Sequence, residues 1–139
     1  MSEGYAGNVP PSAAWETLKT NPDAVLIDVR TEPEWLFVGV PDLSSLGRGL
    51  VRVAWQTYPT MERNPRFEED LRAQGVTPEH ELLILCRSGV RSKAAAILLT
   101  GSGFSLCYNI SDGFEGQIDE KKHRGNGGWR ASGLPWTQG

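Results

Sequence analysis

Short apolar runs separated by helix-like stretches dominate the pattern of hydrophobic and polar positions along the chain. The first run is β-branched and mostly apolar without alternation, which is typical of a strand covered on both faces in a parallel sheet. The runs that predict strands are residues 24–29, 50–55, 82–85 and 106–110. The sequence therefore predicts four short strands.

Helix signals lie between these runs. Ser12 is a predicted N-cap, and the Thr31-Glu32-Pro33-Glu34 run has the form of a capping box. Four helices are predicted. The first follows Ser12, the second spans residues 32–37, the third begins at Asn64-Pro65 and ends at Gly75, and the fourth spans residues 93–100. Strands that alternate with helices imply right-handed crossovers, so we predict an α/β fold with a mostly parallel central sheet flanked by helices on both faces.

Composition indicates one globular domain over residues 1–139. Hydrophobic residues make up 39% and charged residues 22% of the chain, and the net charge is −3. This charge offers no general attraction to nucleic acid or to an anionic membrane, so neither partner is expected. Because the first residues lack a basic start followed by an apolar stretch, and no segment is apolar enough to span a membrane, we predict a cytoplasmic protein with reduced thiols.

Cys86 stands between the 82–85 strand and the following helix. Ligands of open α/β sheets bind at the carboxyl ends of the strands, where loop N–H groups and the helix dipole stabilise an anion. Arg87, Arg91 and Lys93 add positive charge, and residues 86–93 contain no acidic side chain. These features favour the thiolate, so we predict that Cys86 is a nucleophile. The alternative is a buried cysteine that acts as a small hydrophobic residue.

The length of this loop separates two cysteine chemistries. Cysteine-dependent phosphatases resemble one another in having five residues between their cysteine and arginine, whereas four residues separate Cys86 from Arg91. A shorter ring makes a smaller cradle, which suits one extra sulfur atom better than a phosphate group. A phosphatase is therefore the less favoured enzyme.

The other cysteine and the two histidines give no sign of a functional site. Cys107 lies early in a predicted strand without basic neighbours, which indicates a core residue too far from Cys86 for a disulfide. His80 and His123 do not have zinc-like spacing to either cysteine. No metal site is expected.

Several of these segments together resemble the rhodanese (sulfurtransferase) family over most of the chain. Residues 86–92, Cys-Arg-Ser-Gly-Val-Arg-Ser, resemble the active-site loop of the family in its six-residue form. Residues 28–30, Asp-Val-Arg, are similar to the Asp-x-Arg that follows the first core strand. The remaining matches are Asn109 with the glycines Gly113 and Gly116, and the ending Gly128-Trp129 with Gly133-Leu134-Pro135.

The resemblance implies a rhodanese-like domain that transfers sulfur without a metal or organic cofactor. Cys86 would attack a small anionic sulfur donor such as thiosulfate, become a persulfide, and pass the sulfur to cyanide or a thiol. Substrate and persulfide would be held by the loop residues Arg87, Ser88, Gly89, Val90, Arg91 and Ser92. Asp28 and Arg30 are expected to hydrogen-bond each other or the neighbouring loop, and so to support the site.

Two segments depart from the family pattern. Many members have a Gly-His-Ile-Pro-Gly-Ala-like run after the first short helix, whereas this chain has Gly-Val-Pro-Asp-Leu at 39–43 and a longer loop over 40–49. Residues 119–128 form a predicted flexible insert in the C-terminal tail. Its cationic run at 121–124 is typical of a solvated loop, and its only functional interpretation is docking of an acidic partner protein.

Three functions stay open at this stage. The leading hypothesis is a thiosulfate-type sulfurtransferase, and the second is a persulfide carrier or redox sensor that serves an acceptor protein. The third is a non-catalytic interaction module, against which the cysteine in its cationic loop argues. The sequence does not identify the physiological donor or acceptor.

Overall fold

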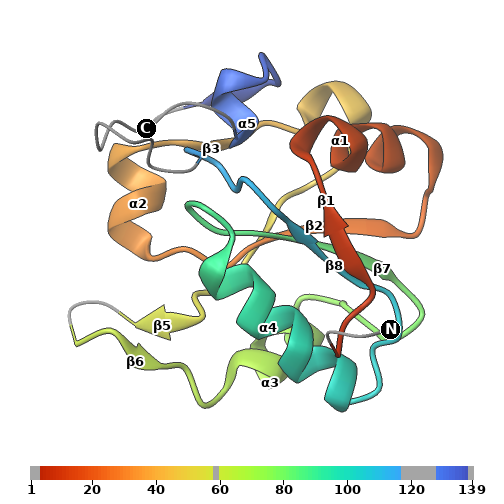
Figure 1. Cartoon of the computed structure of the whole chain (residues 1–139), viewed down its shortest axis with the longest axis vertical. Helices are drawn as coiled ribbons and strands as arrows, with labels where there is room; N and C mark the ends of the chain where they lie inside the picture. Colours follow the sequence, from red (N-terminus) through yellow and green to blue (C-terminus); the bar gives the residue numbers. More distant parts are fainter. Residues whose placement is uncertain (1–3, 58–59, 117–127, 138–139) are drawn as a thin grey trace.

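A parallel sheet of five strands forms the centre of the computed structural model, which describes residues 4–57, 60–116 and 128–137 (Figure 1). The strand order is β1 (Gly7–Val9), β8 (Cys107–Ile110), β7 (Glu81–Leu85), β2 (Ala24–Asp28) and β4 (Val51–Arg52). Every pairing within this sheet is parallel. The predicted α/β class and the mostly parallel sheet are confirmed.

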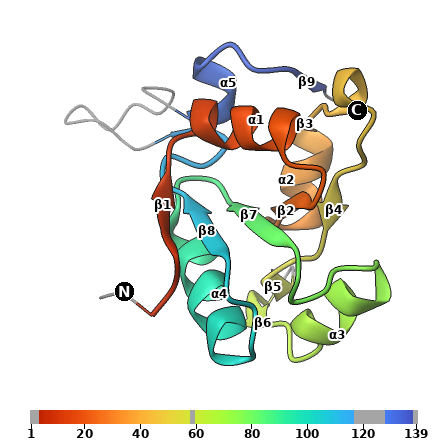
Figure 2. The ribbon, with the colours of Figure 1, turned by 90° about the vertical axis from the view of Figure 1, so that its right-hand side faces the viewer.

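Helices cover both faces of the sheet (Figure 2). One face packs against α1 (Pro11–Thr20) and α5 (Gly128–Ala131), and the other against α3 (Phe67–Ala73) and α4 (Val90–Gly101). The apolar side chains form two clusters, one on each face, because the central strands are covered on both sides. The side chains of Leu26, Leu82 and Ile84 are among those fully buried between these layers.

Shorter elements complete the described chain. The helix α2 (Glu32–Phe37) follows β2, and a single 3₁₀ turn, η1 (Ser44–Leu46), lies within the 40–49 loop. The strand β3 (Val40–Pro41) pairs antiparallel with β9 (Trp136–Thr137), and β5 (Gln56–Thr57) pairs antiparallel with β6 (Glu62–Arg63). The 40–49 loop is therefore joined to the C-terminal segment through β3.

Local signals predict some helix boundaries well and others poorly. The capping box at Thr31 is confirmed, and α2 spans the predicted residues 32–37. The N-cap prediction for Ser12 is wrong: α1 begins at Pro11 after Pro10, and proline suits this first position because it needs no N–H partner there. The helix after Cys86 begins at Val90, three residues before the predicted start.

Two further predictions concern targeting and the tail. Within the part of the chain that the structure describes, no helix has the length and apolar character needed to cross a membrane. A location in the cytoplasm stays a prediction. The predicted flexible insert at 119–128 lies outside the described residues except for Gly128, which is the first residue of α5.

Candidate active site around Cys86

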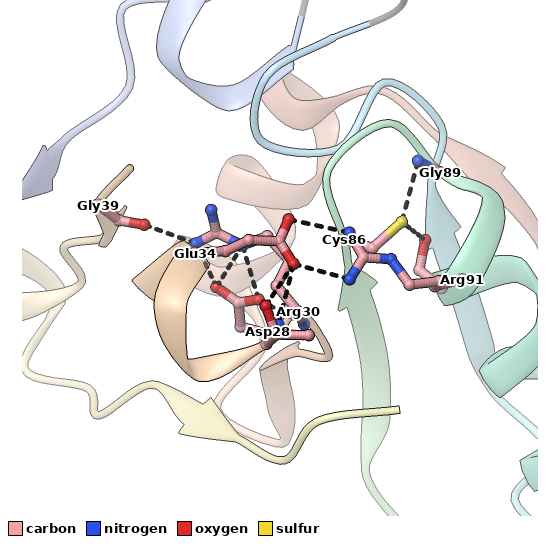
Figure 3. A network of polar contacts seen from close by, with 9 residues as sticks. Asp28, Arg30, Glu34, Gly39, Cys86, Gly89 and Arg91 are labelled. Carbon is pink, nitrogen blue, oxygen red and sulfur yellow. Dashed lines mark hydrogen bonds and ion pairs between the residues drawn. The ribbon is translucent and has the colours of Figure 1, made fainter. Parts of the chain in front are cut away.

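Cys86 directly follows β7, and its sulfur lies inside the turn that leads into α4 (Figure 3). The backbone N–H of Gly89 donates a hydrogen bond to Sγ over 3.0 Å, and Ser92 Oγ lies 3.2 Å from the same atom. Gly89 has a φ of 110°, a conformation that side-chain-bearing residues rarely adopt, so glycine suits this position in the turn. Cys86 is only 1% exposed, so the Gly89 N–H and the Ser92 hydroxyl make up much of the polar environment of its sulfur.

The turn after β8 supports the back of the loop. Phe114 N–H donates to the carbonyl of Cys86 over 2.8 Å, and Glu115 N–H donates to the carbonyl of Arg87 over 3.0 Å. Gly113 allows this approach, because a Cβ atom there would lie 2.5 Å from the carbonyl oxygen of Cys86. The turn therefore fixes the backbone on which the thiol stands.

Arg91 is tied to α2. Its guanidinium donates two hydrogen bonds to the carboxylate of Glu34, over 2.8 and 2.9 Å, in a bidentate ion pair (Figure 3). Burial alone would raise the pKa of Glu34, but hydrogen bonds from Arg91 and Thr31 outweigh it and lower the pKa to about 2. That Arg91 binds a substrate stays a prediction, and any such contact has to share the guanidinium with Glu34.

Glu34 is one residue at the site that the sequence did not indicate. Its capping-box position explains a hydrogen bond to Thr31, but not a partner 57 positions along the chain. Only the folded arrangement of α2 beside the start of α4 brings the two charges together. The pair joins the loop that carries Cys86 to the helix that follows β2.

Replacing Glu34 with glutamine is expected to remove a pH-dependent part of the stability. A carboxyl group whose pKa falls from 4.5 to about 2 stabilises the folded state fully above pH 4.5, and this contribution disappears as the pH falls toward 2. Because solvent screens this partly exposed pair, the loss at neutral pH should be about 1 to 2 kcal/mol, less than the full pKa shift would give. Urea unfolding should therefore show Glu34→Gln less stable than the parent at pH 7 and nearly equal to it at pH 2.

The matched control for this experiment is Glu32→Gln, which changes an exposed glutamate in the same helix. We expect this variant to follow the parent at every pH. The same free energy of unfolding for the parent and Glu34→Gln at pH 7 would contradict the role of the ion pair.

Asp28 and Arg30 form a buried ion pair at the carboxyl end of β2. Both side chains are 0% exposed, and Arg30 Nη2 lies 2.7 Å from Asp28 Oδ2. The same nitrogen donates to the carbonyl of Gly39, and the guanidinium stacks 4.3 Å from the centre of the Phe114 ring. The predicted hydrogen bonds of these residues to each other and to a neighbouring loop are present, and the stacking of Arg30 on Phe114 links β2 with the turn behind Cys86.

The structure separates the predicted loop residues by where they lie. Gly89 and Ser92 meet at the sulfur of Cys86, whereas Arg87 and Val90 are exposed at the outer surface of the loop. Ser88 is half-buried. None of these positions tests binding of a substrate, so those roles stay predictions.

Cys107 is a core residue, as predicted. It lies opposite Leu82 in the β7–β8 pairing, at the other end of the strand from Cys86, and both thiols are free. Burial raises the pKa of Cys107 to about 11. Among residues 4–57, 60–116 and 128–137, no group of three or more histidine, cysteine, aspartate or glutamate side chains is arranged to hold a metal ion.

A cavity of about 740 Å³ lies between α2, the 52–57 segment and α3. Its lining includes Trp35, Val53 and Asp70, but no residue of the 86–92 loop. A cavity of this size could hold a small ligand, whereas the polar contacts on the sulfur point to the Cys86 loop as the site of chemistry. Among the described residues, the lining of the cavity contains carboxylates and a hydroxyl, at Glu32, Asp70 and Thr57, but no cysteine.

Comparison with known proteins shows the family of this chain. The family model described as "STR4 middle domain" matches residues 7–139. An uncharacterized protein of Rickettsia conorii is 38% identical over 93% of this chain and 95% of its own length. The rhodanese-like domain-containing protein 4 of Arabidopsis thaliana chloroplasts is 31% identical over 90% of this chain and 24% of its own length. The chain belongs to the rhodanese-like family.

Two further comparisons place the protein within the rhodanese-like family. The crystal structure of Rv0390 from M. tuberculosis aligns with a TM-score of 0.88 and 52% identity, and covers 97% of this chain and 99% of that chain. The thiosulfate sulfurtransferase GlpE of Actinobacillus pleuropneumoniae is 27% identical over 97% of this chain and 95% of its own length. The rhodanese-like fold is thus shared with relatives of similar length.

Proposed function

We propose that this rhodanese-like protein is a sulfurtransferase that carries sulfane sulfur as a persulfide on Cys86. The observation that carries the proposal is the pair of groups on the sulfur, the Gly89 N–H and the Ser92 hydroxyl, at the start of α4. Both can donate hydrogen bonds to a negatively charged sulfur, and the helix dipole favours the same charge. The name of the GlpE relative, thiosulfate sulfurtransferase, supports thiosulfate as the donor to test first.

The first half-reaction forms one sulfur–sulfur bond and breaks another. The thiolate of Cys86 attacks the outer sulfur of thiosulfate, and sulfite leaves with the electron pair of the broken bond. In this proposal Arg87, which is exposed beside the cysteine, attracts the doubly negative donor. In the second half-reaction, cyanide or a thiolate attacks the outer sulfur of the persulfide and restores the Cys86 thiolate. Neither step requires a metal or an organic cofactor.

Intact-protein mass spectrometry after brief exposure to thiosulfate, without reductant, tests the proposal. We expect the parent to gain the mass of one sulfur atom and Cys86→Ser to gain none. Cys107→Ser is the matched control: because its thiol is buried with a raised pKa, this variant should load sulfur as the parent does. Equal uptake by the parent and Cys86→Ser would refute a persulfide on Cys86.

The fate of the loaded sulfur distinguishes an enzyme from a carrier. A sulfurtransferase of the thiosulfate type should lose the added mass when cyanide is supplied, with release of thiocyanate. If the loaded protein resists cyanide but passes its sulfur to a protein thiol, the persulfide-carrier function holds instead. An exposed Val90, 75% accessible at the loop surface, gives such an acceptor an apolar contact next to the site.

A further inference from the structure

A chain of hydrogen bonds leads from Cys86 across the sheet to its edge strand. Ser92 Oγ lies 3.2 Å from Cys86 Sγ, and the hydroxyl donates to Asn109 Oδ1 on β8. Asn109 Nδ2 donates to Asn8 Oδ1 on β1 over 3.0 Å. Tyr5 OH donates to the same oxygen of Asn8 over 2.8 Å. These five residues, which we call the polar relay, connect the sulfur to the N-terminal strand.

The polar relay is buried except at one member. Cys86, Ser92, Asn109 and Tyr5 are each between 0% and 4% exposed, whereas Asn8 lies at the surface. Asn8 and Asn109 are opposite each other in the β1–β8 pairing, so the strands hold their side chains side by side. Water has little access to the inner members, and each of them depends on its neighbours for hydrogen-bond partners.

Ser92 has a single hydroxyl hydrogen, and the sulfur and Asn109 compete for it. While that hydrogen is donated to Asn109 Oδ1, Ser92 can only accept a hydrogen bond, and it then pairs with a protonated thiol. A thiolate or a persulfide anion has no hydrogen to donate and needs a donor instead. The direction of the hydrogen bonds in the relay, in which Ser92 donates to Asn109, therefore suits the neutral thiol. An anionic sulfur needs the opposite direction, in which Ser92 donates to the sulfur.

We propose that the polar relay reverses its hydrogen-bond direction when Cys86 becomes negatively charged, and that Asn8 and Asn109 are positioning residues for the anionic sulfur. A half-turn of the Asn109 amide presents Nδ2 to Ser92, which frees the Ser92 hydrogen for the sulfur. A half-turn of Asn8 then presents its NH₂ group to Asn109 and to Tyr5. Every pair of residues keeps its contact, while the amide oxygen and nitrogen of each asparagine change places and the donor and acceptor roles exchange.

The inference rests on the proposed function only in taking Cys86 as the group that becomes negative. Other charges also face this region: Arg87, Arg91 and Lys93 from the loop and α4, Glu34 from α2, Asp28 and Arg30 from β2, and Asp112 and Glu115 from the turn after β8. Among the contacts described, Asn8 pairs with Tyr5 and Asn109, not with these groups. A substitution at Asn8 therefore acts on the relay without removing any of those charges.

Asn8→Asp tests the relay from its exposed end. A carboxylate can only accept, so it holds Asn109 Nδ2 toward β1 and Asn109 Oδ1 toward Ser92, which withholds the hydrogen of Ser92 from the sulfur. The ultraviolet absorbance of the thiolate, measured against pH with the same variant carrying Cys86→Ser as the blank, reports the ionisation. We expect its midpoint to rise by about one pH unit, because the anion loses one charge-assisted hydrogen bond.

Two controls separate the relay from the added negative charge. Pro10→Asp places a carboxylate on an exposed residue two positions along, beside the β8 end nearest the loop, and we expect a clearly smaller shift. In a Ser92→Ala background the relay ends before the sulfur, so Asn8→Asp should no longer move the midpoint. Equal shifts in Asn8→Asp and Pro10→Asp, or an undiminished shift without Ser92, would overturn the inference.

This test does not depend on sulfur transfer. A protein that takes up no sulfur from thiosulfate, but whose thiolate midpoint responds to Asn8→Asp through Ser92, would refute the proposed donor and keep the relay. A protein that loads sulfur normally but shows no coupling between Asn8 and Ser92 would support the proposed donor and refute the relay. The thiolate midpoint of Asn8→Asp should also be measured in molar salt. Salt screens the effect of the added charge on the midpoint and leaves the effect of the hydrogen bonds in place.

Discussion

Replacing Arg30 with methionine is expected to destabilise the domain by about 3 to 5 kcal/mol, the effect of removing one partner of a buried ion pair. Asp28 and Arg30 are both 0% exposed, so the substitution leaves the Asp28 carboxylate without its counter-charge and out of reach of water. The carbonyl of Gly39 also loses its charged donor. Urea unfolding at neutral pH measures the change as a lower free energy of unfolding.

An exposed ion pair provides the matched comparison. Lys19→Met removes one partner of the Lys19–Glu16 pair, whose side chains are 47% and 64% exposed, and should change the free energy of unfolding by less than about 1 kcal/mol. The double variant Asp28→Asn with Arg30→Met should recover part of the loss, because no charge then remains buried. If Arg30→Met were no more destabilising than Lys19→Met, the buried pair would not support this end of the sheet.

Local signals explain which parts of the fold the sequence predicted. The helix α2 was predicted to the residue because a capping box acts through contacts within four positions. The strand β1 was missed because Gly-Asn-Val is short and has no apolar run, and its place depends on pairing with β8, about 100 positions away. Non-local pairing likewise joins β3 to β9. No local pattern contains that information.

The same division holds for the candidate site. The position of Cys86 between a strand and a helix can be predicted from the sequence of the loop and its flanks. The partner of Arg91 cannot be predicted in this way, because an arginine at the start of a helix does not indicate that Glu34 on α2 will pair with it. Asn8 gave no signal at all. Residues that act across the sheet become visible only when the register of its strands is known.

Replacing Gly113 with alanine is expected to reduce sulfur transfer by about a hundredfold, the effect of displacing a reacting group by about 1 Å. The new Cβ would lie 2.5 Å from the Cys86 carbonyl oxygen and 2.6 Å from the Arg87 carbonyl carbon. Both are backbone atoms, so relief requires the loop itself to move. That movement weakens the hydrogen bonds from Phe114 and Glu115 which hold the loop, and it shifts the sulfur away from the N–H of Gly89.

Gly47→Ala isolates the loop contact from simple backbone strain. Gly47 has a φ of 68°, close to the 60° of Gly113, but nothing lies within 4 Å of the position where a Cβ would be added. Both variants therefore carry the cost of a left-handed alanine, and only Gly113→Ala carries the clash. Steady-state transfer from thiosulfate to cyanide should separate them, with Gly47→Ala close to the parent. Equal activities would mean that the turn after β8 does not set the position of Cys86.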